Sequence, residues 1–395
     1  MIPIDLKKIN SYIMALYIFQ FGFLQPISSI INSQFFIGVF TIILVTLALV
    51  LNRFQIKKSV GILFLIVGIY FLSNSLIYNS NLDIIISIYF EFILKGFSGL
   101  IIGSLDTEYD TLYEAFFKIA IINFIIIAPY PFVSFLSSMN YMRFGYAMIP
   151  STIMFLFATF DKERKKIICG LLFLISFYLT FVYGSRGPIV VILVLGLLVF
   201  LFDKRYNFKK RNIIIFLSIS IAFVFLKYNV PGKFLNYLYF DLGIKNYSVM
   251  KFQRMFNGQF LAATSGRDRI YKESWKIIKS NFIFGHGVGF IETSINKKAH
   301  NVFLQILSES GVIGLMVWGL LAIICAKKYI NAMKYDSVTF IKISNLLISV
   351  SLGRLLVSSD IWLRPEFWFT VSLLLGYKKQ VDIGYIDNNG MRVKC

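Results

Sequence analysis

The sequence predicts an all-α polytopic integral membrane protein, and three observations support this fold class. Hydrophobic residues make up 57% of the 395 residues, aromatic residues 17% and charged residues only 15%, which is unlike an ordinary soluble domain. Apolar runs of about 17 to 25 residues recur along the chain, each long enough to cross a hydrocarbon core as an α-helix. The basic residues collect in alternate connecting segments, as expected for a chain that crosses a membrane repeatedly.

The apolar runs predict about twelve transmembrane helices. We place them at 12–31, 35–51, 59–78, 84–102, 115–137, 145–160, 167–183, 188–202, 212–228, 301–325, 340–357 and 362–377.

The net charge of +20 would suggest nucleic acid in a soluble protein, but its placement indicates membrane topology. With the N-terminus inside, the cytoplasmic segments hold most basic residues, which is the positive-inside pattern. An acidic segment near 104–114 is the local exception. These cytoplasmic groups are Lys7, Lys8, Arg53, Lys57, Lys58, the segments 161–166 and 203–211, Lys327, Lys328, Lys334, Lys378 and Lys379. We therefore expect both termini to be cytoplasmic and the protein to lie in the cytoplasmic (inner) membrane.

The predicted organisation has four parts. Residues 1–228 form an N-terminal bundle of about nine helices, 229–300 form a large periplasmic or extracellular loop, 301–378 form about three further membrane helices, and 379–395 form a cytoplasmic tail. Loops as long as 229–300 are usually functional when they occur in compact proteins.

The outer loop contains both histidines of the chain and an excess of basic over acidic residues. One interpretation is a surface that attracts anionic headgroups; the sharper one is a site for an anionic ligand. Ser265 and Asp268 resemble a capping box, and Ile270, Ile277 and Ile278 then share the apolar face of an amphipathic helix. Arg267 falls in its first turn, where backbone N–H groups and the helix dipole favour a phosphate.

The glycines of GHGVG at 285–289 superficially resemble a dinucleotide-binding motif, but no strand precedes them. We interpret them instead as a tight turn before the chain re-enters the membrane. His286 between them is either a residue that faces a ligand or a turn residue.

His300 stands at the start of the span 301–325, which carries a polar stripe at helical spacing. A polar stripe costs free energy in lipid, so we expect it to face the protein interior or a wet cavity. The carboxylate of Glu309 in this stripe contacts either substrate or a neighbouring helix. The stripe consists of Asn301, Gln305, Ser308 and Glu309.

Arg186 lies in a very short outward-facing turn between two predicted helices. It is either an arginine that snorkels to the membrane interface or a second guanidinium pointing at the same cavity as Arg267. Guanidinium groups grip phosphate oxygens bidentately, and histidine can accept a hydroxyl proton near neutral pH. This combination suits glycosyl transfer from a lipid pyrophosphate. The chain has no DxD sequence and no CxxC spacing, so we predict no metal site.

These elements together resemble the O-antigen polymerase and O-antigen ligase superfamily, polytopic proteins with a large outer loop. The resemblance covers about 50 contiguous residues, and the Ser-Arg-Gly at 185–187 agrees with a further family feature. The chain departs from many relatives at 282–284, where Phe-Ile-Phe replaces a segment with proline. The matching elements are Gly266-Arg267, Trp275, Gly285-His286-Gly287, His300-Asn301, Leu304 and Glu309 to Gly314.

The resemblance implies a metal-independent, GT-C-like glycosyltransferase that uses undecaprenyl-pyrophosphate-linked saccharides and no cofactor. It implies that Arg186 and Arg267 contact pyrophosphate and that His300 is the catalytic histidine. We add substrate-binding candidates from the same region: Arg269, Asn301, Gln305, Glu309 and His286.

The predicted function is an O-antigen or related capsular polysaccharide polymerase, with donor and acceptor both linked to undecaprenyl pyrophosphate. Membrane lipids, a chain-length regulator and a flippase are the further expected partners, and no nucleic acid is. An O-antigen ligase that transfers the glycan to lipid A core is one alternative. A flippase or transporter of lipid-linked oligosaccharide is another, and charges within the spans, such as Glu91, Lys95 and Arg354, would favour it.

Overall fold

The computed structural model describes residues 5–31, 35–78, 82–132, 141–161, 164–202, 230–243, 247–256, 266–334, 338–358 and 360–377, which form helices and no β-strand. The first half of the chain forms α1 (Leu6–Phe23), α2 (Gln25–Ile30), α3 (Phe35–Leu51), α4 (Lys58–Ile77), α5 (Leu82–Glu91), α6 (Ser98–Gly103), α7 (Tyr109–Ile127), α8 (Tyr141–Thr159), α9 (Lys166–Tyr183) and α10 (Gly187–Phe202). The second half forms α12 (Val230–Asn236), α13 (Tyr247–Phe256), α15 (Arg267–Ser280), α16 (Phe290–Ile295), α17 (Val302–Lys334), α18 (Val338–Leu355) and α19 (Pro365–Leu375).

The helices before residue 203 and after residue 301 follow the predicted apolar spans, whereas α12, α13, α15 and α16 lie in the predicted loop 229–300. The predicted span 212–228 lies outside the described residues. Six of the described helices are long and apolar enough to cross a membrane: Lys58–Ile77, Leu82–Gly103, Tyr109–Phe132, Lys166–Tyr183, Val302–Lys334 and Val338–Leu355. The prediction of an all-α membrane protein is confirmed. The total of twelve spans and the four-part division stay predictions, and the tail 379–395 is outside the described residues.

Two predicted helices differ in the structure. The first, 12–31, is divided: α1 begins after Asp5, whose carboxylate accepts the N–H of Lys8 at 3.2 Å, and α2 follows Leu24. The tenth, 301–325, continues to Lys334 and is interrupted at Gly311, where φ is 61° and ψ is −157°. Hydropathy alone could show neither change, because the apolar character continues across both positions.

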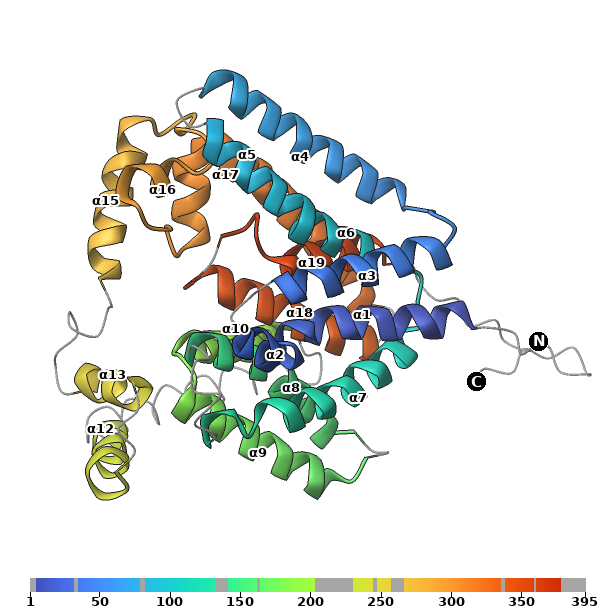
Figure 1. Cartoon of the computed structure of the whole chain (residues 1–395), viewed down its shortest axis with the longest axis vertical. Helices are drawn as coiled ribbons and strands as arrows, with labels where there is room; N and C mark the ends of the chain where they lie inside the picture. The colour runs from blue at the N-terminus through green and yellow to red at the C-terminus, as the bar shows by residue number, and fades with distance from the viewer. Residues whose placement is uncertain are drawn as a thin grey trace, which may run out of the picture.

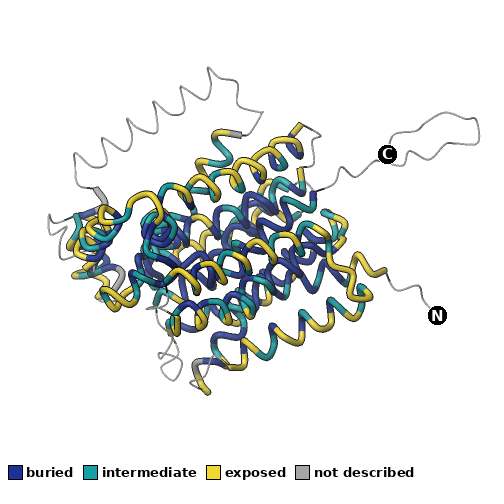
Figure 2. The backbone as a smooth tube through the Cα atoms, turned by 90° about the horizontal axis from the view of Figure 1, so that it is seen from above, coloured by how far each residue is buried: buried dark blue, intermediate teal, exposed yellow. Residues whose placement is uncertain are grey.

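The buried residues gather in the middle of the bundle, and exposed residues line the outer helices (Figure 2). The main core draws large side chains from α1, α7, α8, α18 and α19, among them Met14, Phe116, Phe155, Phe340 and Phe369. On the outside, apolar residues of α4 such as Leu65 and Leu72 are more than half exposed. Such a surface is expected where a helix faces lipid.

Gly99 and Gly103 let α6 approach the backbone of α19 very closely. A Cβ on either residue would lie 2.5 Å from a carbonyl oxygen of α19, that of Pro365 or Phe369 respectively. This spacing of small residues is typical of tight helix contacts in membranes, and the Ser372 hydroxyl adds a hydrogen bond to the Leu100 carbonyl at 2.7 Å. The contact fixes the position of α19, and therefore of the charged residues at its start.

Figure 1 shows α15 and α16 together at one end of the bundle, with α15 running crosswise to α1, whose first residues lie at the opposite end. Leu356 and Ile361, between α18 and α19, form hydrogen bonds with Asn301 and Gln305 at the start of α17. This end of the bundle contains the residues that the sequence singled out.

Candidate functional site

Helix α15 brings Arg267 to its first turn, as the sequence predicts, but through a different cap. The N-cap is Gly266, with φ of 78° and no side-chain cap bond. The predicted capping box involves Ser265, which lies outside the described residues, so it stays a prediction. The buried face of α15 consists of Ile270, Ser274 and Ile278. Glycine accepts a left-handed conformation without the steric cost that a side chain adds, so it can turn the chain sharply into the helix.

Arg269, a predicted substrate-binding residue, points away from this face. Its side chain is 84% exposed and pairs with Glu273 one turn later at 3.5 Å. Arg267, by contrast, is only partly exposed and its charge acts on His300. The two neighbouring arginines therefore have different environments.

The segment 282–287 closes the interruption of α17 by backbone hydrogen bonds alone. In an unbroken helix, the carbonyls before Gly311 would accept the N–H groups one turn later; here both sets bond to the segment instead. The four bonds join the N–H of His286 to the Ser308 carbonyl (2.7 Å), Gly287 to Glu309 (2.9 Å), Val312 to Phe282 (3.0 Å) and Ile313 to Ile283 (3.3 Å). We call this arrangement the backbone clip.

The glycines of the clip are required by its geometry. A Cβ on Gly311 would lie 2.2 Å from the Ile283 carbonyl oxygen, and a Cβ on Gly285 would lie 2.5 Å from the Glu309 carbonyl carbon. Gly285 and Gly287 also have φ of 74° and 91°, a region that favours glycine. The interpretation of GHGVG as a tight turn agrees with this geometry, and the clip explains why Glu309-Ser-Gly belongs to the same motif.

In the structure, the side chain of His286 contacts residues next to this turn. Its Nε2 lies 3.0 Å from the Ser280 hydroxyl, and its ring stacks on Phe290 with centroids 4.6 Å apart. Partial burial lowers the pKa of His286. These contacts are local, and they agree with the turn-residue interpretation.

The polar stripe of α17 faces the chain's own segment 356–362. Asn301 caps the helix, since its Oδ1 accepts the N–H groups of Phe303 at 2.9 Å and Leu304 at 3.2 Å. Its amide nitrogen donates to the Leu356 carbonyl at 3.3 Å. The stripe is thus buried in the protein interior, as predicted.

Gln305 and Glu309 complete this contact. The Ile361 N–H donates to Gln305 at 3.1 Å, and Glu309 accepts one bond from Gln305 and one from the Trp362 indole, both at 2.9 Å. Asn301, Gln305 and Glu309 were predicted to bind substrate. In this structure their hydrogen bonds hold a neighbouring segment in place, which is the alternative that the sequence left open for Glu309.

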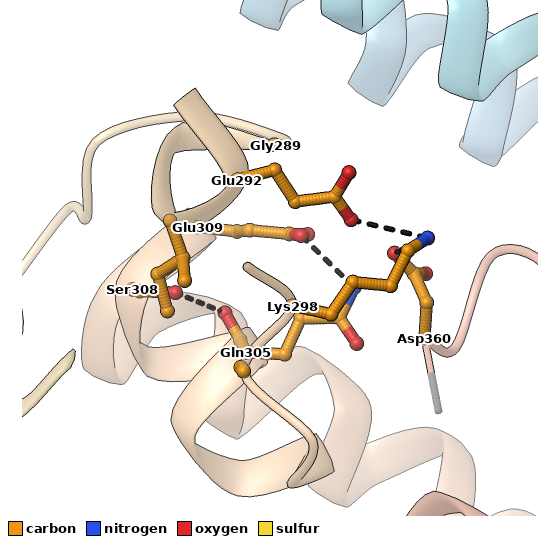
Figure 3. Close-up of a pocket in the computed structure, with 9 residues that line it drawn as sticks. Gly289, Glu292, Lys298, Gln305, Ser308, Glu309 and Asp360 are labelled. Atoms are coloured by element: carbon orange, nitrogen blue, oxygen red, sulfur yellow. Dashed lines mark hydrogen bonds and ion pairs between the residues drawn. The ribbon is translucent and has the colours of Figure 1, made fainter. Parts of the chain in front are cut away.

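A small cavity lies beside this stripe (Figure 3). Lys298 reaches Glu292 at 3.2 Å and Asp360 at 3.9 Å, and Glu309 lies on the other side. The cavity volume is about 10 Å³, room for roughly one water molecule. It is too small for a sugar, so we assign it to the packing between the outer loop and the segment 356–364.

His300 lies two residues after Lys298 and adopts a left-handed conformation with φ of 54°. Burial lowers the pKa of His300, and the positive charge of Arg267 lowers it further, whereas a hydrogen bond to the Ser358 carbonyl acts in the opposite direction. Its Nδ1 is buried and has no hydrogen-bond partner within the described parts of the chain. The Tyr271 hydroxyl of α15, one turn after Arg267, donates to the His300 carbonyl at 3.5 Å, so the helix that begins with the predicted phosphate ligand contacts the predicted base.

Four further residues lie together here that the sequence did not assign to the site: Tyr146, Arg354, Arg364 and Glu366. Arg354, which the sequence analysis placed within a membrane span, forms an ion pair with Glu366 at 2.6 Å. Its guanidinium carbon lies over the Tyr146 ring, 4.7 Å from the ring centroid. The charges of Arg354, Arg267 and Arg364 all act on the Tyr146 hydroxyl. We call Arg267, Arg354 and Arg364 the arginine cluster. Burial and the charge of Arg354 lower the pKa of Arg364 to about 10, which still leaves it charged at neutral pH.

Arg186 sits on a turn that packs against the same tyrosine. A Cβ on Gly187 would lie 1.9 Å from the Tyr146 hydroxyl, and a Cβ on Gly145 would lie 3.1 Å from the Ser185 nitrogen. These close approaches explain the glycine after Arg186, Gly187, and the glycine on the facing helix α8, Gly145. They place the backbone of Arg186 beside Tyr146, and so at the edge of the arginine cluster.

Comparison with known proteins gives one family. Residues 171–319 match the O-antigen ligase family model, Wzy_C, a segment that contains Arg186, Arg267 and His300 and ends before Arg354. No curated protein matches the chain significantly. The family match confirms the resemblance to the O-antigen polymerase and O-antigen ligase superfamily that the motifs predicted.

Proposed function

We propose that the protein is a metal-independent, GT-C-like glycosyltransferase that polymerises undecaprenyl-pyrophosphate-linked repeat units at the outer face of the cytoplasmic membrane. The observation that carries this proposal is the contact of His300 with the helix that begins at Arg267: the Tyr271 hydroxyl of α15 donates to the His300 carbonyl at 3.5 Å. A base beside guanidinium groups suits a reaction in which a hydroxyl loses a proton and a pyrophosphate leaves. The match to the O-antigen ligase family supports the same chemistry.

In the proposed reaction, the growing chain on its lipid pyrophosphate is the donor. A hydroxyl oxygen of the incoming lipid-linked unit forms a bond to the anomeric carbon of the donor, and its proton passes to the neutral imidazole of His300. The bond between the anomeric carbon and the pyrophosphate oxygen breaks, and the oxygen keeps the electron pair. Arg267 and Arg186 stabilise the charge on the departing lipid pyrophosphate.

Purified protein in liposomes, supplied with lipid-linked repeat units and no second protein, tests this proposal. We expect a ladder of polymers. Transfer only to lipid A core would indicate the ligase, which the name of the matching family supports. Movement of lipid-linked sugar without any product would indicate a transporter.

Two pairs of variants sharpen the assay. His300→Ala is expected to lower the rate about 10²- to 10⁴-fold, the usual share of a positioned base, whereas His286→Ala, which loses only turn contacts, should leave the ladder intact. Arg267→Lys is expected to weaken donor binding about tenfold, because a lysine loses the bidentate grip. Arg269→Lys is its matched control, since Arg269 is exposed. Equal effects within either pair would contradict the assigned roles.

The charges that would favour a transporter have other partners in the structure. Lys95 pairs with Glu91 on the same helix, and Arg354 pairs with Glu366. Ion pairs of this kind need no transported substrate to explain them. The polymerase is also expected to work beside a flippase and a chain-length regulator, which the purified assay omits on purpose.

A further inference from the structure

Three consecutive large apolar side chains are exposed in the backbone clip. Phe282, Ile283 and Phe284 are 48%, 57% and 63% exposed, although the sequence places them in the outer loop 229–300. A run of exposed apolar residues is unexpected in a segment that faces water, and such a patch commonly marks a contact with a membrane or a partner.

The clip places this segment beside the lipid-facing part of α17. The Phe282 and Ile283 carbonyls accept the N–H groups of Val312 and Ile313, and α17 is one of the helices long and apolar enough to cross a membrane. From this point onward its outer face is apolar, with Ile313, Met316, Val317 and Leu320 all exposed. The exposed segment therefore borders a surface that a transmembrane helix turns toward lipid.

The same loop is tied to the end of α4, a second helix of transmembrane length. The Tyr78 hydroxyl donates to the Gly285 carbonyl at 3.1 Å, and the Val288 N–H donates to Asn74 Oδ1 at 3.0 Å. Next to these contacts, Leu76 and Ile77 of α4 are 72% and 69% exposed. The segment 282–284 is thus held at the level of two lipid-facing surfaces.

The backbone of the segment is suited to lipid as well. Non-helical backbone is tolerated at membrane depth only where its polar groups have partners inside the protein. The Phe282 and Ile283 carbonyls bond to α17, and the Gly285 N–H donates to the Asn281 carbonyl at 2.9 Å. None of these bonds uses a side chain of 282–284. The three apolar side chains can therefore enter lipid while these backbone groups stay paired.

We propose that Phe282, Ile283 and Phe284 form a membrane anchor, with their side chains at the boundary between the headgroups and acyl chains of the leaflet next to the outer loop. Apolar side chains on surface segments bind lipid at this depth. Because α15 ends at Ser280, the anchor also holds the helix that begins at Arg267 close to the membrane. This interaction surface is separate from the proposed glycosyl transfer and does not depend on it.

Spin labels on single cysteines test the anchor in liposomes of the purified full-length protein, with the three native cysteines replaced by alanine. Ile283→Cys is the test position and Met316→Cys the lipid reference. Lys276→Cys is the aqueous reference, because Lys276 is exposed on α15 away from the buried face of Ile270, Ser274 and Ile278. We expect the label at position 283 to collide with oxygen, which concentrates in lipid, as readily as the label at 316. Its collisions with a water-soluble nickel chelate should be several-fold fewer than at 276.

Two outcomes would overturn the proposal. Nickel access at position 283 equal to that at 276 would place the segment in water. Shielding of the label from both oxygen and nickel would show that protein covers the segment, such as a second copy of the chain.

Ile283→Asp gives an independent measurement. Since the Ile283 side chain is more than half exposed, an aspartate there would be harmless in water, where surface substitutions have small effects, but costly in lipid. We expect a lower unfolding temperature than wild type in lipid nanodiscs. Ile283→Leu, which stays apolar, is the control and should leave the temperature unchanged. An equally unchanged temperature for Ile283→Asp would contradict the anchor.

Discussion

The backbone clip and the arginine cluster are formed by different groups of the chain: main-chain N–H and carbonyl groups form the clip, and charged side chains form the cluster. The clip joins the segment 282–287 to the break at Gly311 through main-chain groups. The arginine cluster consists of charged side chains from α15, α18 and the N-cap of α19, and among them Arg354 lies over the Tyr146 ring. The glycines of the sequence motif therefore shape the scaffold, whereas the charges come partly from the motif, at Arg267, and partly from beyond it, at Arg354 and Arg364.

The largest effect is expected in the clip. Gly311→Ala places a Cβ 2.2 Å from the Ile283 carbonyl oxygen at a φ of 61°. Backbone strain of this kind costs about 1–3 kcal/mol, and the clash must also displace the segment 282–287. We expect severe loss of folded protein, measured by thermal unfolding in detergent. Gly319→Ala in the same helix meets nothing within 4 Å and should be neutral or slightly stabilising.

The next effect is expected in the arginine cluster. Glu366→Ala removes the carboxylate that pairs with Arg354 at 2.6 Å and leaves the cationic side chains facing one another. Breaking a buried pair in this way costs about 3–5 kcal/mol. The free energy of unfolding should fall accordingly. Glu273→Ala, which breaks the exposed pair with Arg269, should cost no more than about 1 kcal/mol. Similar losses in both variants would contradict the importance of burial.

Much of the fold could be predicted because membrane helices must be long and apolar. The break in α17 could not, since its reason is the segment 282–287, some twenty-five residues earlier in the chain. The hydropathy pattern of a helix does not show which of its backbone groups form hydrogen bonds with another segment of the chain.

Some residues of the candidate site could likewise be predicted from the sequence, and others could not. Arg267 and His300 stood out because charged and titratable residues are unusual beside apolar spans. Tyr146 could not be singled out from the sequence, because a tyrosine within an apolar run is ordinary. Its hydroxyl contacts Ser358, which lies more than two hundred residues away in the chain. Arg354 was noticed but placed within the bilayer, since its partner Glu366 belongs to the next helix.

A smaller effect is expected where the clip meets the polar stripe. Glu309 accepts bonds from Gln305 and the Trp362 indole. Glu309→Gln keeps the shape but turns an amide N–H₂ toward one of these donors, which leaves buried polar groups unsatisfied at a cost of about 1–3 kcal/mol. Thermal unfolding should show this loss. Polymer formation per folded molecule should remain, and a complete loss of activity would instead give Glu309 a direct role.

The smallest effect concerns pH and separates the two histidines. Burial lowers the pKa of both His286 and His300 below the usual value of 6.5. For stability, the unfolded chain then binds protons more readily, so each histidine reduces the free energy of unfolding as pH falls from 6.5 through the pKa of the folded state. For activity, only His300 matters: its neutral form persists below pH 6.5, so the rate should begin to fall only at lower pH.

His286→Ala separates these effects. It should reduce the loss of stability in acid, by less than about 1 kcal/mol, and leave the pH dependence of the rate unchanged. A rate profile that moves with His286→Ala would mean that the clip takes part in the chemistry. The division between scaffold and site would then be wrong.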